Sequence, residues 1–356
     1  MADSVQDDLA RAERWLKSNT KRNAFKKLEK EIVKTGVCTE CGACVSNCPV
    51  DALTGVYTTG KYVPTLTGNC TSCGICYTVC PRTLVFWKDL VGDFRSAWKV
   101  RSKLQNEKRQ DGGAVIAFLS YMLDKKIVEA AVVTRQDTKK PWMPVAVLAV
   151  KKEELMVAGG SIYTHSPVVQ EMMRGFKSGL KTIAVVGTSC NIDAISKMET
   201  HPAGLLQIDL GLGAFKIGLF CMESFTYTGL VQFLEKAGVD LKEVQRMAIS
   251  SGVFTVTTSQ GKHEWPVEDL SRATASSCSY CRDFSCKNAD LSCGNIGSDE
   301  GWTTVLVRTI RGEQILQESA ADGYIEAELL DPKGLESIER VARSKAMRYY
   351  SLKPER

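Results

Sequence analysis

A cysteine motif that occurs twice near the start of the chain constrains its fold more than any other feature. The spacing C-x2-C-x2-C-x3-C-P runs from Cys38 to Pro49 and again from Cys70 to Pro81. In the bacterial iron–sulfur pattern, three closely spaced thiolates hold one 4Fe–4S cluster, and the cysteine before proline ligates the other cluster. The spacing therefore predicts two crossed ligand sets. The first set is Cys38, Cys41, Cys44 and Cys80, and the second is Cys70, Cys73, Cys76 and Cys48.

Disulfides and zinc are the alternatives for these eight cysteines. Zinc sites use pairs of C-x2-C and gain nothing from a third cysteine and a proline at these offsets. The chain starts with acidic residues rather than with a basic and then apolar leader, and the longest apolar stretch, 144–150, is far shorter than the roughly 18 residues of a spanning helix. We expect a reducing cytoplasmic location, either free or peripheral on the cytoplasmic face of a membrane.

The length of the chain predicts a second and larger domain. The paired motif needs only about 60 of the 356 residues. We expect a helical extension at 1–34, a two-cluster ferredoxin domain at 35–90 and a larger domain at 91–356. The basic face of the extension fits either a solvated helix or a docking helix for a partner subunit. The net charge is only +5 and no basic block is interleaved with aromatics, so nucleic acid binding is not expected.

The larger domain has the pattern of a mixed α/β (α+β) fold. Buried strands and amphipathic helices alternate, and residues 84–110 are expected to join the two domains. The expected strands are 130–134, 144–150, 181–187, 216–221, 253–258 and 303–308, and the expected helices are 114–125, 168–176, 192–198, 225–237 and 335–347. The glycines at 211–216 lack the third glycine of a dinucleotide fingerprint and precede a strand, so the domain is predicted to be non-Rossmann.

Three small-residue turns precede helices in this domain. They contain Gly112 and Gly113, the stretch 159–167, and the stretch 187–191. Such turns let backbone N–H groups approach an anion at the positive end of a helix. Cys190 lies at a helix N-terminus, where a thiolate is favoured. None of the three histidines lies in a metal-ligand spacing, and each is more typical of a turn or a surface.

Six further cysteines leave three arrangements open. Cys190, Cys221, Cys278 and Cys281 fit a third 4Fe–4S cluster, because two follow strands and two form a C-x2-C clamp. Cys278, Cys281, Cys286 and Cys293 fit a compact zinc site. In the third arrangement most of the six are small buried apolar residues.

Several stretches resemble the coenzyme F420 hydrogenase/dehydrogenase beta-subunit family. They are 112–119, 160–167, 186–190, 219–221, 278–284 and 289–304, so the resemblance covers roughly residues 110–310. With two ferredoxin motifs fused in front, the chain is most similar to the F420-oxidising input subunits of archaeal F420 dehydrogenase complexes. Ser189, Cys286 and Cys293 depart from the family pattern, in which proline and small residues are common at these positions.

The resemblance implies that the larger domain binds FAD and exchanges hydride with F420, in either direction. It favours the third cluster on Cys190, Cys221, Cys278 and Cys281. The implied cofactor-binding residues are Gly112, Gly113, Gly160, Ser161, Tyr163, Ser166, Gly187, Thr188, Asn191, Gly297, Ser298 and Thr303. No separate catalytic side chain is expected, because the hydride passes between bound cofactors.

The tail of F420 carries phosphate and glutamates, which Lys139, Lys140 or Arg282 would attract. The expected partners are other subunits of a redox complex, of the membrane dehydrogenase, heterodisulfide-reductase or hydrogenase type. Two alternatives remain at this point. One is an electron-transfer or docking subunit without hydride chemistry. The other is the same fold acting on another substrate, as in formate dehydrogenase beta subunits or chlorophyll-derivative reductases.

Overall fold

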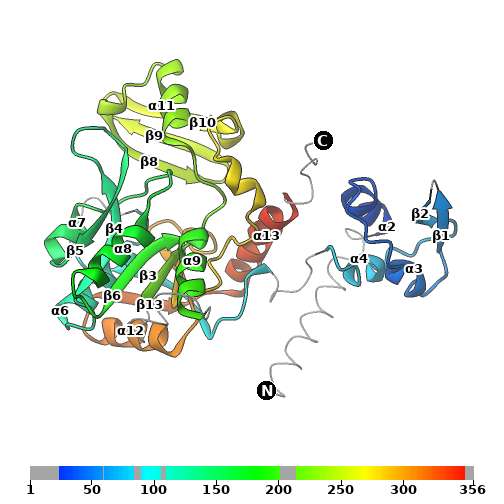
Figure 1. Ribbon diagram of the computed structural model, residues 1–356, viewed down its shortest axis with the longest axis horizontal. Helices are drawn as coiled ribbons and strands as arrows, with labels where there is room; N and C mark the ends of the chain where they lie inside the picture. Colours follow the sequence, from blue (N-terminus) through cyan, green and yellow to red (C-terminus); the bar gives the residue numbers. More distant parts are fainter. Residues whose placement is uncertain (1–23, 59, 84–89, 106–109, 201–213, 349–356) are drawn as a thin grey trace. The chain divides into compact units, whose positions relative to one another are not determined.

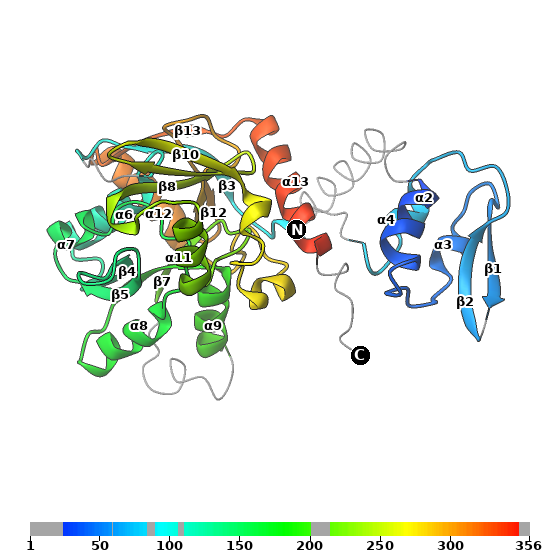
Figure 2. The same cartoon turned by 90° about the horizontal axis from the view of Figure 1, so that it is seen from above.

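A computed structural model describes residues 24–58, 60–83, 90–105, 110–200 and 214–348. The chain divides into two compact units, one made of Met1–Leu90 and Arg343–Arg356 and the other of Val91–Ala342. Figures 1 and 2 show both units from two directions. Most of the helical extension expected at 1–34 lies outside the described residues. Its described part contains α2 (Phe25–Leu28) and the π-helix η1 (Glu29–Val33).

The cysteine repeat in the sequence is also a repeat in the structure of the smaller unit. Each copy ends in a one-turn helix, α3 (Ala43–Ser46) in the first and α4 (Ile75–Thr78) in the second. The residue before each helix is a glycine in the left-handed region, Gly42 at φ 73° and Gly74 at φ 81°. Only glycine adopts this conformation without a steric cost, which explains the Cys-Gly pair in both copies. An antiparallel hairpin, β1 (Leu53–Thr58) with β2 (Lys61–Leu66), lies between them.

An eight-stranded mixed sheet forms the centre of the larger unit, in the order β13-β3-β12-β11-β7-β6-β4-β5. The four adjacent strands β11, β7, β6 and β4 are parallel, and the strands on either side of them pair antiparallel. The strands are β3 (Ser96–Ser102), β4 (Ala130–Gln136), β5 (Pro144–Ala149), β6 (Ile183–Thr188), β7 (Phe215–Leu219), β11 (Leu291–Gly294), β12 (Thr303–Val307) and β13 (Ile325–Leu329).

Helices cover both faces of this sheet, because alternate strand residues point to opposite sides. In β4, Ala131 and Val133 pack with α6 (Ala114–Asp124), whereas Val132 packs with α8 (Val168–Lys177). The first face also carries α7 (Lys152–Met156) and α12 (Ile310–Ala321), and the second carries α9 (Ser189–Thr200). Because helices cover both faces of the sheet, residues that bind a ligand are expected at its edges, where the strands end.

A smaller antiparallel sheet of three strands has a hydrophobic core of its own. It contains β8 (Val244–Ser250), β9 (Val253–Thr258) and β10 (Gly261–Pro266). Phe254 of β9 is fully buried there with residues of α11 (Tyr227–Lys236). Short 3-10 helices η2 (Leu241–Glu243), η3 (Val267–Leu270) and η4 (Ser276–Tyr280) connect the segments around it. The last helix, α13, spans Pro332–Arg348.

The mixed α/β fold with an N-terminal ferredoxin unit is confirmed, but one expected connection is wrong. Residues 84–110 were expected only to join the domains, whereas Ser96–Ser102 form β3, which lies between β12 and β13 in the large sheet. The charged residues of β3 point outward, where Lys99 and Arg101 pair with Glu328 and Glu326 of β13. Within the described ranges, no helix is long and apolar enough to cross a lipid bilayer.

Candidate functional site

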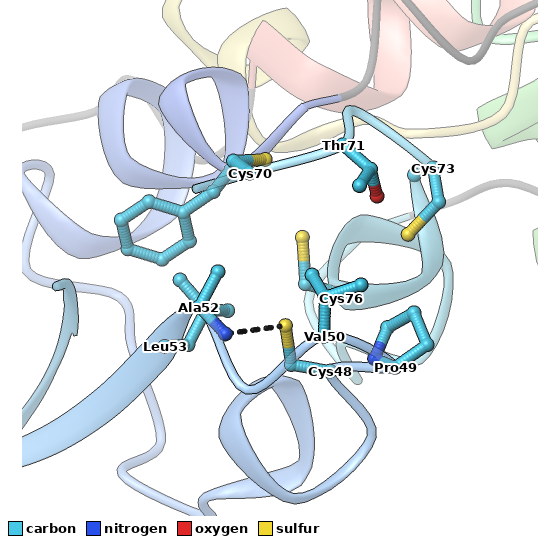
Figure 3. Close-up of a pocket in the computed structure, with 11 residues that line it drawn as sticks. Cys48, Pro49, Val50, Ala52, Leu53, Cys70, Thr71, Cys73 and Cys76 are labelled. Carbon is cyan, nitrogen blue, oxygen red and sulfur yellow. Dashed lines mark hydrogen bonds between the residues drawn. The ribbon is translucent and has the colours of Figure 1, made fainter. Parts of the chain in front are cut away.

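Two pockets in the smaller unit each collect four cysteines. Figure 3 shows the first pocket, in which the sulfur atoms of Cys48, Cys70, Cys73 and Cys76 face a common space. The second is lined by Cys38, Cys41, Cys44 and Cys80. The two groups are those of the crossed ligand assignment, since Cys48 and Cys80 each join the triplet of the other copy.

Backbone N–H groups already point at the cysteine sulfurs in both copies. The N–H of Glu40 donates to Cys38 Sγ at 3.5 Å, and that of Ser72 donates to Cys70 Sγ at 3.4 Å. Glu40 and Ser72 occupy the same position of the repeat and share a left-handed backbone, with φ of 59° and 57°. The N–H of Ala52 donates to Cys48 Sγ at 3.2 Å. Such bonds stabilise thiolate charge, which is what iron ligands carry.

Burial makes two of these thiols resist ionisation in the absence of a metal. Burial, followed by the nearby cysteine charges, raises the pKa of Cys44 to about 11 and that of Cys76 to about 12. A bound iron ion reverses this preference, because its positive charge stabilises the coordinating thiolate. Converging thiols with this electrostatic environment therefore fit iron ligands.

The topology of the large sheet brings the other site segments to one edge. Thr188 pairs with Leu219, and Leu219 with Cys293, so the carboxyl ends of β6, β7 and β11 lie next to each other. Because β12 runs the opposite way, its first residue Thr303 lies at the same edge, opposite Val100 near the end of β3. In open α/β sheets, ligands bind outside the carboxyl ends of parallel strands.

Hydrogen bonds tie the loop 281–286 to two of these strand ends. The hydroxyl of Ser189 donates to the Asp283 carbonyl at 3.0 Å, beside Cys190. The N–H of Cys221 donates to the Phe284 carbonyl at 2.9 Å. Both contacts draw the segment after Cys281 towards the ends of β6 and β7.

Two isolated β-bridges connect the segments that carry His165 and Cys278 to the segment after Cys221. Phe225, four residues after Cys221, bridges to Thr164 on one side and to Thr274 on the other. Thr274 precedes Cys278 by four residues, and the N–H of Ser224 donates to Cys278 Sγ at 3.3 Å. The segments that carry Cys190, Cys221, Cys278 and Cys281 are thus joined by backbone bridges and side-chain hydrogen bonds despite their separation in sequence.

His165 lies among these cysteines, which the sequence did not indicate. Its Nε2 is 3.8 Å from Cys278 Sγ, and it also forms a hydrogen bond with Cys190. The bond with Cys190, followed by that with Cys278, raises the pKa of His165 to about 10. The same contact lowers the pKa of Cys190. The neighbouring residue Thr164 forms a bridge with Phe225, which brings His165 close to the cysteine segments. This contact depends on the tertiary fold and cannot be read from the sequence.

Cys286 and Cys293 are packing residues, and the zinc arrangement that included them is wrong. Cys286 is fully buried against Gly218, and Cys293 lies within β11 in a different hydrophobic cluster. A zinc site needs four ligand atoms about 2.3 Å from one point. In the part of the chain that the structure describes, no three His, Cys, Asp or Glu side chains approach closely enough to hold a single metal ion.

Four of the residues predicted to bind the flavin form one cluster. The amide of Asn191 accepts a hydrogen bond from the Thr188 hydroxyl at 3.0 Å and donates to the Ser166 carbonyl at 3.5 Å. Gly187 lies directly against the Asn191 side chain, so a Cβ there would be 2.9 Å from Asn191 Cβ. The Ser166 hydroxyl is buried and has no partner within the protein.

The remaining predicted residues include the two glycines before α6. A Cβ on Gly112 would come within 2.5 Å of the Thr303 nitrogen, so this glycine allows close packing of the chain. Gly113 is the left-handed residue before α6, and no side chain caps the helix. The hydroxyls of Ser298 and Thr304 are 2.5 Å apart. Gly297, with φ at 103°, packs against the backbone of Gly334.

Tyr163 joins the turn at 160–166 to the small sheet. Its ring packs against Phe254, its oxygen accepts a hydrogen bond from Ile249 N at 2.9 Å, and Ser161 forms a further hydrogen bond to it. Burial raises the pKa of Tyr163 to about 12. Gly160 precedes this pair with φ at 95°. The tyrosine therefore fixes this turn against the small sheet.

The basic residues proposed for the F420 tail lie on turns. The N–H groups of Lys139 and Lys140 donate to Asp137 Oδ1 at 2.8 and 2.9 Å, at the end of the β4 strand. Arg282 follows Cys281. Arg246 of β8 is a candidate that the sequence did not suggest, because it interacts with Asp111 beside the start of α6. Burial raises the pKa of Asp111, and Arg246 opposes this effect.

Comparison with protein families covers most of the larger unit and the cysteine repeat of the smaller one. Residues 180–333 match the C-terminal part, and residues 97–172 the N-terminal part, of the family described as "Coenzyme F420 hydrogenase/dehydrogenase, beta subunit". Residues 37–84 match a 4Fe-4S dicluster domain.

Two relatives and one solved structure show the extent of the similarity. The coenzyme F420 hydrogenase subunit beta of Methanothermobacter thermautotrophicus is 33% identical over 262 residues, which is 72% of this chain and 92% of that protein. One F(420)H(2) dehydrogenase subunit from Methanosarcina mazei is 29% identical over 334 residues, covering 88% of this chain and 91% of that protein. In the F420-reducing [NiFe] hydrogenase complex from Methanosarcina barkeri, one chain superimposes with a TM-score of 0.69 at 30% identity, covering 73% of this chain and 91% of that one.

Proposed function

The chain belongs to the coenzyme F420 hydrogenase/dehydrogenase beta-subunit family, and on this premise we propose that it oxidises reduced F420 through a bound FAD and passes single electrons through 4Fe–4S clusters to a partner complex. The reverse direction uses the same components. The observation that carries the proposal is the convergence at one sheet edge of the small-residue turns, the cysteine group and the start of α6.

The residues at this edge fit a flavin with an anionic pyrophosphate. The buried hydroxyls of Ser166 and Thr164 have no partner within the protein, and such groups usually bind a ligand or water. The N-terminus of α6 has no side-chain cap, so its first N–H groups are available to an anion. These donors support FAD at the turns 112–113, 160–166 and 187–191.

When bound, FAD supplies the exchange between a two-electron hydride donor and one-electron acceptors. The protein must hold and orient the reacting groups and exclude water from them. In this assignment, Asn191 orients the turn around Thr188 and Ser166, and Tyr163 fixes the neighbouring turn against β8. Arg246, with Lys139 and Lys140 as alternatives, attracts the anionic tail of F420.

The clusters provide the outlet for electrons. We assign the two pockets of the smaller unit to two 4Fe–4S clusters with the crossed cysteine sets. We assign a third cluster to Cys190, Cys221, Cys278 and Cys281, whose segments are joined at the sheet edge. Since Cys190 directly follows the Thr188 turn, this third cluster is the one next to the flavin donors.

Two measurements on the anaerobically reconstituted full chain test the proposal. Denaturation should release one flavin per chain, and the protein should oxidise reduced F420 with a viologen as the acceptor. NADH should be a much poorer donor. A chain without stoichiometric flavin would be an electron-transfer or docking subunit, and equal or better use of NADH would assign the fold to another substrate.

Iron analysis tests the cluster count separately. Three clusters correspond to about twelve irons per chain, and two clusters to about eight. A matched variant, Cys190→Ser, should lower the count by about four irons while the ferredoxin signals persist. A count of about eight in the unsubstituted chain would remove the third cluster and leave the donor assay unaffected.

A further inference from the structure

His165 is the only histidine described among the cysteines of the sheet edge, and the structure fixes its backbone. Thr164 forms a parallel bridge with Phe225, and the Phe225 N–H donates to the Tyr163 carbonyl at 2.7 Å. On the other side, Asn191 donates to the Ser166 carbonyl. The residues on both sides of His165 are therefore held by the segments that carry Cys221 and Cys190.

The imidazole links cysteines from two different segments. Its Nε2 lies 3.8 Å from the sulfur of Cys278 in η4, and the ring also forms a hydrogen bond with Cys190 at the start of α9. Cys278 Sγ accepts a further bond from the N–H of Ser224 at 3.3 Å. The Cys190 sulfur is 3.2 Å from the Thr188 hydroxyl. Each sulfur thus has a second polar neighbour besides the imidazole, and for Cys278 this neighbour is a backbone N–H donor.

A histidine on a turn is often only a solvated surface residue. Here the residue as a whole is exposed, but its Nε2 lies 3.8 Å from the Cys278 sulfur. His263 offers the contrast, because its ring stacks on Trp265 at 6.0 Å on β10. The environment of His165 is therefore specific to the cysteine group.

Hydrogen bonds to a ligating sulfur raise the reduction potential of an iron–sulfur cluster, because they stabilise the more negative, reduced form of the cluster. We propose that His165 is a positioning residue that donates a hydrogen bond to Cys278 and raises the reduction potential of the third cluster, so that this cluster accepts electrons from the flavin. The inference rests on the proposed function, specifically on the third cluster.

Three variants of the full chain separate hydrogen bonding from shape. His165→Leu removes the donor at similar volume, and His165→Gln keeps an N–H donor on a side chain of similar length. His263→Leu is the matched control. The measurements are iron content and an anaerobic redox titration monitored by electron paramagnetic resonance, neither of which requires F420 turnover.

His165→Leu should keep about twelve irons and make one of the three clusters harder to reduce. We expect about a tenfold change in its one-electron equilibrium constant, which corresponds to about 59 mV. His165→Gln should restore most of the shift, and His263→Leu should change nothing. An unchanged potential in His165→Leu, or the same shift in His165→Gln, would overturn the proposal.

Iron content distinguishes the remaining outcomes. Loss of about four irons in His165→Leu alone would overturn the tuning role, because it would make His165 necessary to hold the cluster. About eight irons in the unsubstituted chain would overturn both the third cluster and this inference. Cys190 would then be a free thiolate that iodoacetamide alkylates. Oxidation of reduced F420 by the same sample would still support the proposed function.

Discussion

The two cysteine-rich regions of this protein are built in different ways. In the smaller unit, the eight cysteines lie between Cys38 and Cys80 and form two copies of one spacing, and short glycine turns bring them together. In the larger unit, the segments that carry Cys190, Cys221, Cys278 and Cys281 are joined only because β6 and β7 end side by side and bridges tie later segments to them. Local turns create the first arrangement, and sheet topology creates the second.

The two regions also differ in what stabilises them. The hydrophobic cluster of the smaller unit contains Cys44 and Cys76 next to Leu28 and Tyr77, so potential iron ligands are part of its core. The larger unit has separate clusters on the two faces of its sheet. A small domain with few apolar residues depends on metal more strongly than one with a core of its own.

Removal of iron should give the largest difference between the two regions. Oxidation with ferricyanide in the presence of a chelator should unfold the smaller unit, because four thiols around each empty pocket leave its core poorly packed. The larger unit should stay folded. Hydrogen exchange followed by mass spectrometry would compare β1 and α4 with β6 and β7. Equal protection of both regions after iron removal would contradict this difference.

Arg308 provides the next largest expected effect. Its partly buried guanidinium donates to Ser292 Oγ at 2.6 Å and to the carbonyls of Asp93, Val91 and Ser285 at 2.9 to 3.0 Å. Burial lowers the pKa of Arg308 to about 10. Arg308→Met should reduce the free energy of unfolding of the larger unit by about 3 kcal/mol, because several buried acceptors lose their donor.

The control for this substitution is Arg101→Met. Arg101 pairs with Glu326 at 2.6 Å, and both side chains are substantially exposed. Exposed ion pairs contribute about 0–1 kcal/mol, so denaturant unfolding should detect little change. Similar losses in both variants would show that the loop after Cys281 does not depend on Arg308.

Gly112→Ala should have an intermediate effect on the flavin edge. The added Cβ would meet backbone atoms, the Thr303 nitrogen and the Val100 oxygen, at 2.5 Å, and neither can move without displacing a strand. We expect a loss of about 1–3 kcal/mol and a lower flavin content, with iron in the smaller unit unchanged. Flavin release and thermal unfolding measure the two effects. Full flavin content at unchanged stability would show that the packing of β3 and β12 does not shape the site.

Tyr163→Phe should have the smallest effect. The substitution removes the acceptor for Ile249 N but keeps the ring packed on Phe254. A loss of about 1 kcal/mol is expected, with flavin content maintained. Denaturant unfolding and flavin analysis of the same sample give both values. Loss of flavin without loss of stability would mean that the tyrosine contacts the cofactor directly.

The contrast between local turns and sheet topology also explains which region could be predicted from the sequence. The spacing around Cys38 and Cys70 predicted both ligand groups that the pockets contain, because neighbouring residues determine a local turn. In contrast, β3 was not predicted, since Lys99 and Arg101 interrupt its apolar pattern and pair with β13, which is distant in sequence. His165 was not predicted either, because its contact with Cys278 spans 113 residues.

Glycines and cysteines were harder to interpret than strands. Gly112 and Gly187 were predicted to bind a cofactor, and packing against protein atoms also requires a glycine at both positions. Cys286 and Cys293 share the residue type of the cluster ligands, but they fill the two faces of the sheet. Residue type alone does not separate a ligand from a packing residue when the contacts depend on the whole sheet.

Electron transfer from reduced F420 to the clusters is tested most directly by following both cofactors in one sample. Reduced F420 would be added without oxygen to the reconstituted full chain, with the flavin followed by absorbance and the clusters by electron paramagnetic resonance. We expect the flavin to bleach and the signal of reduced 4Fe–4S clusters to appear. Clusters that dithionite reduces but that reduced F420 leaves oxidised would contradict the proposed function.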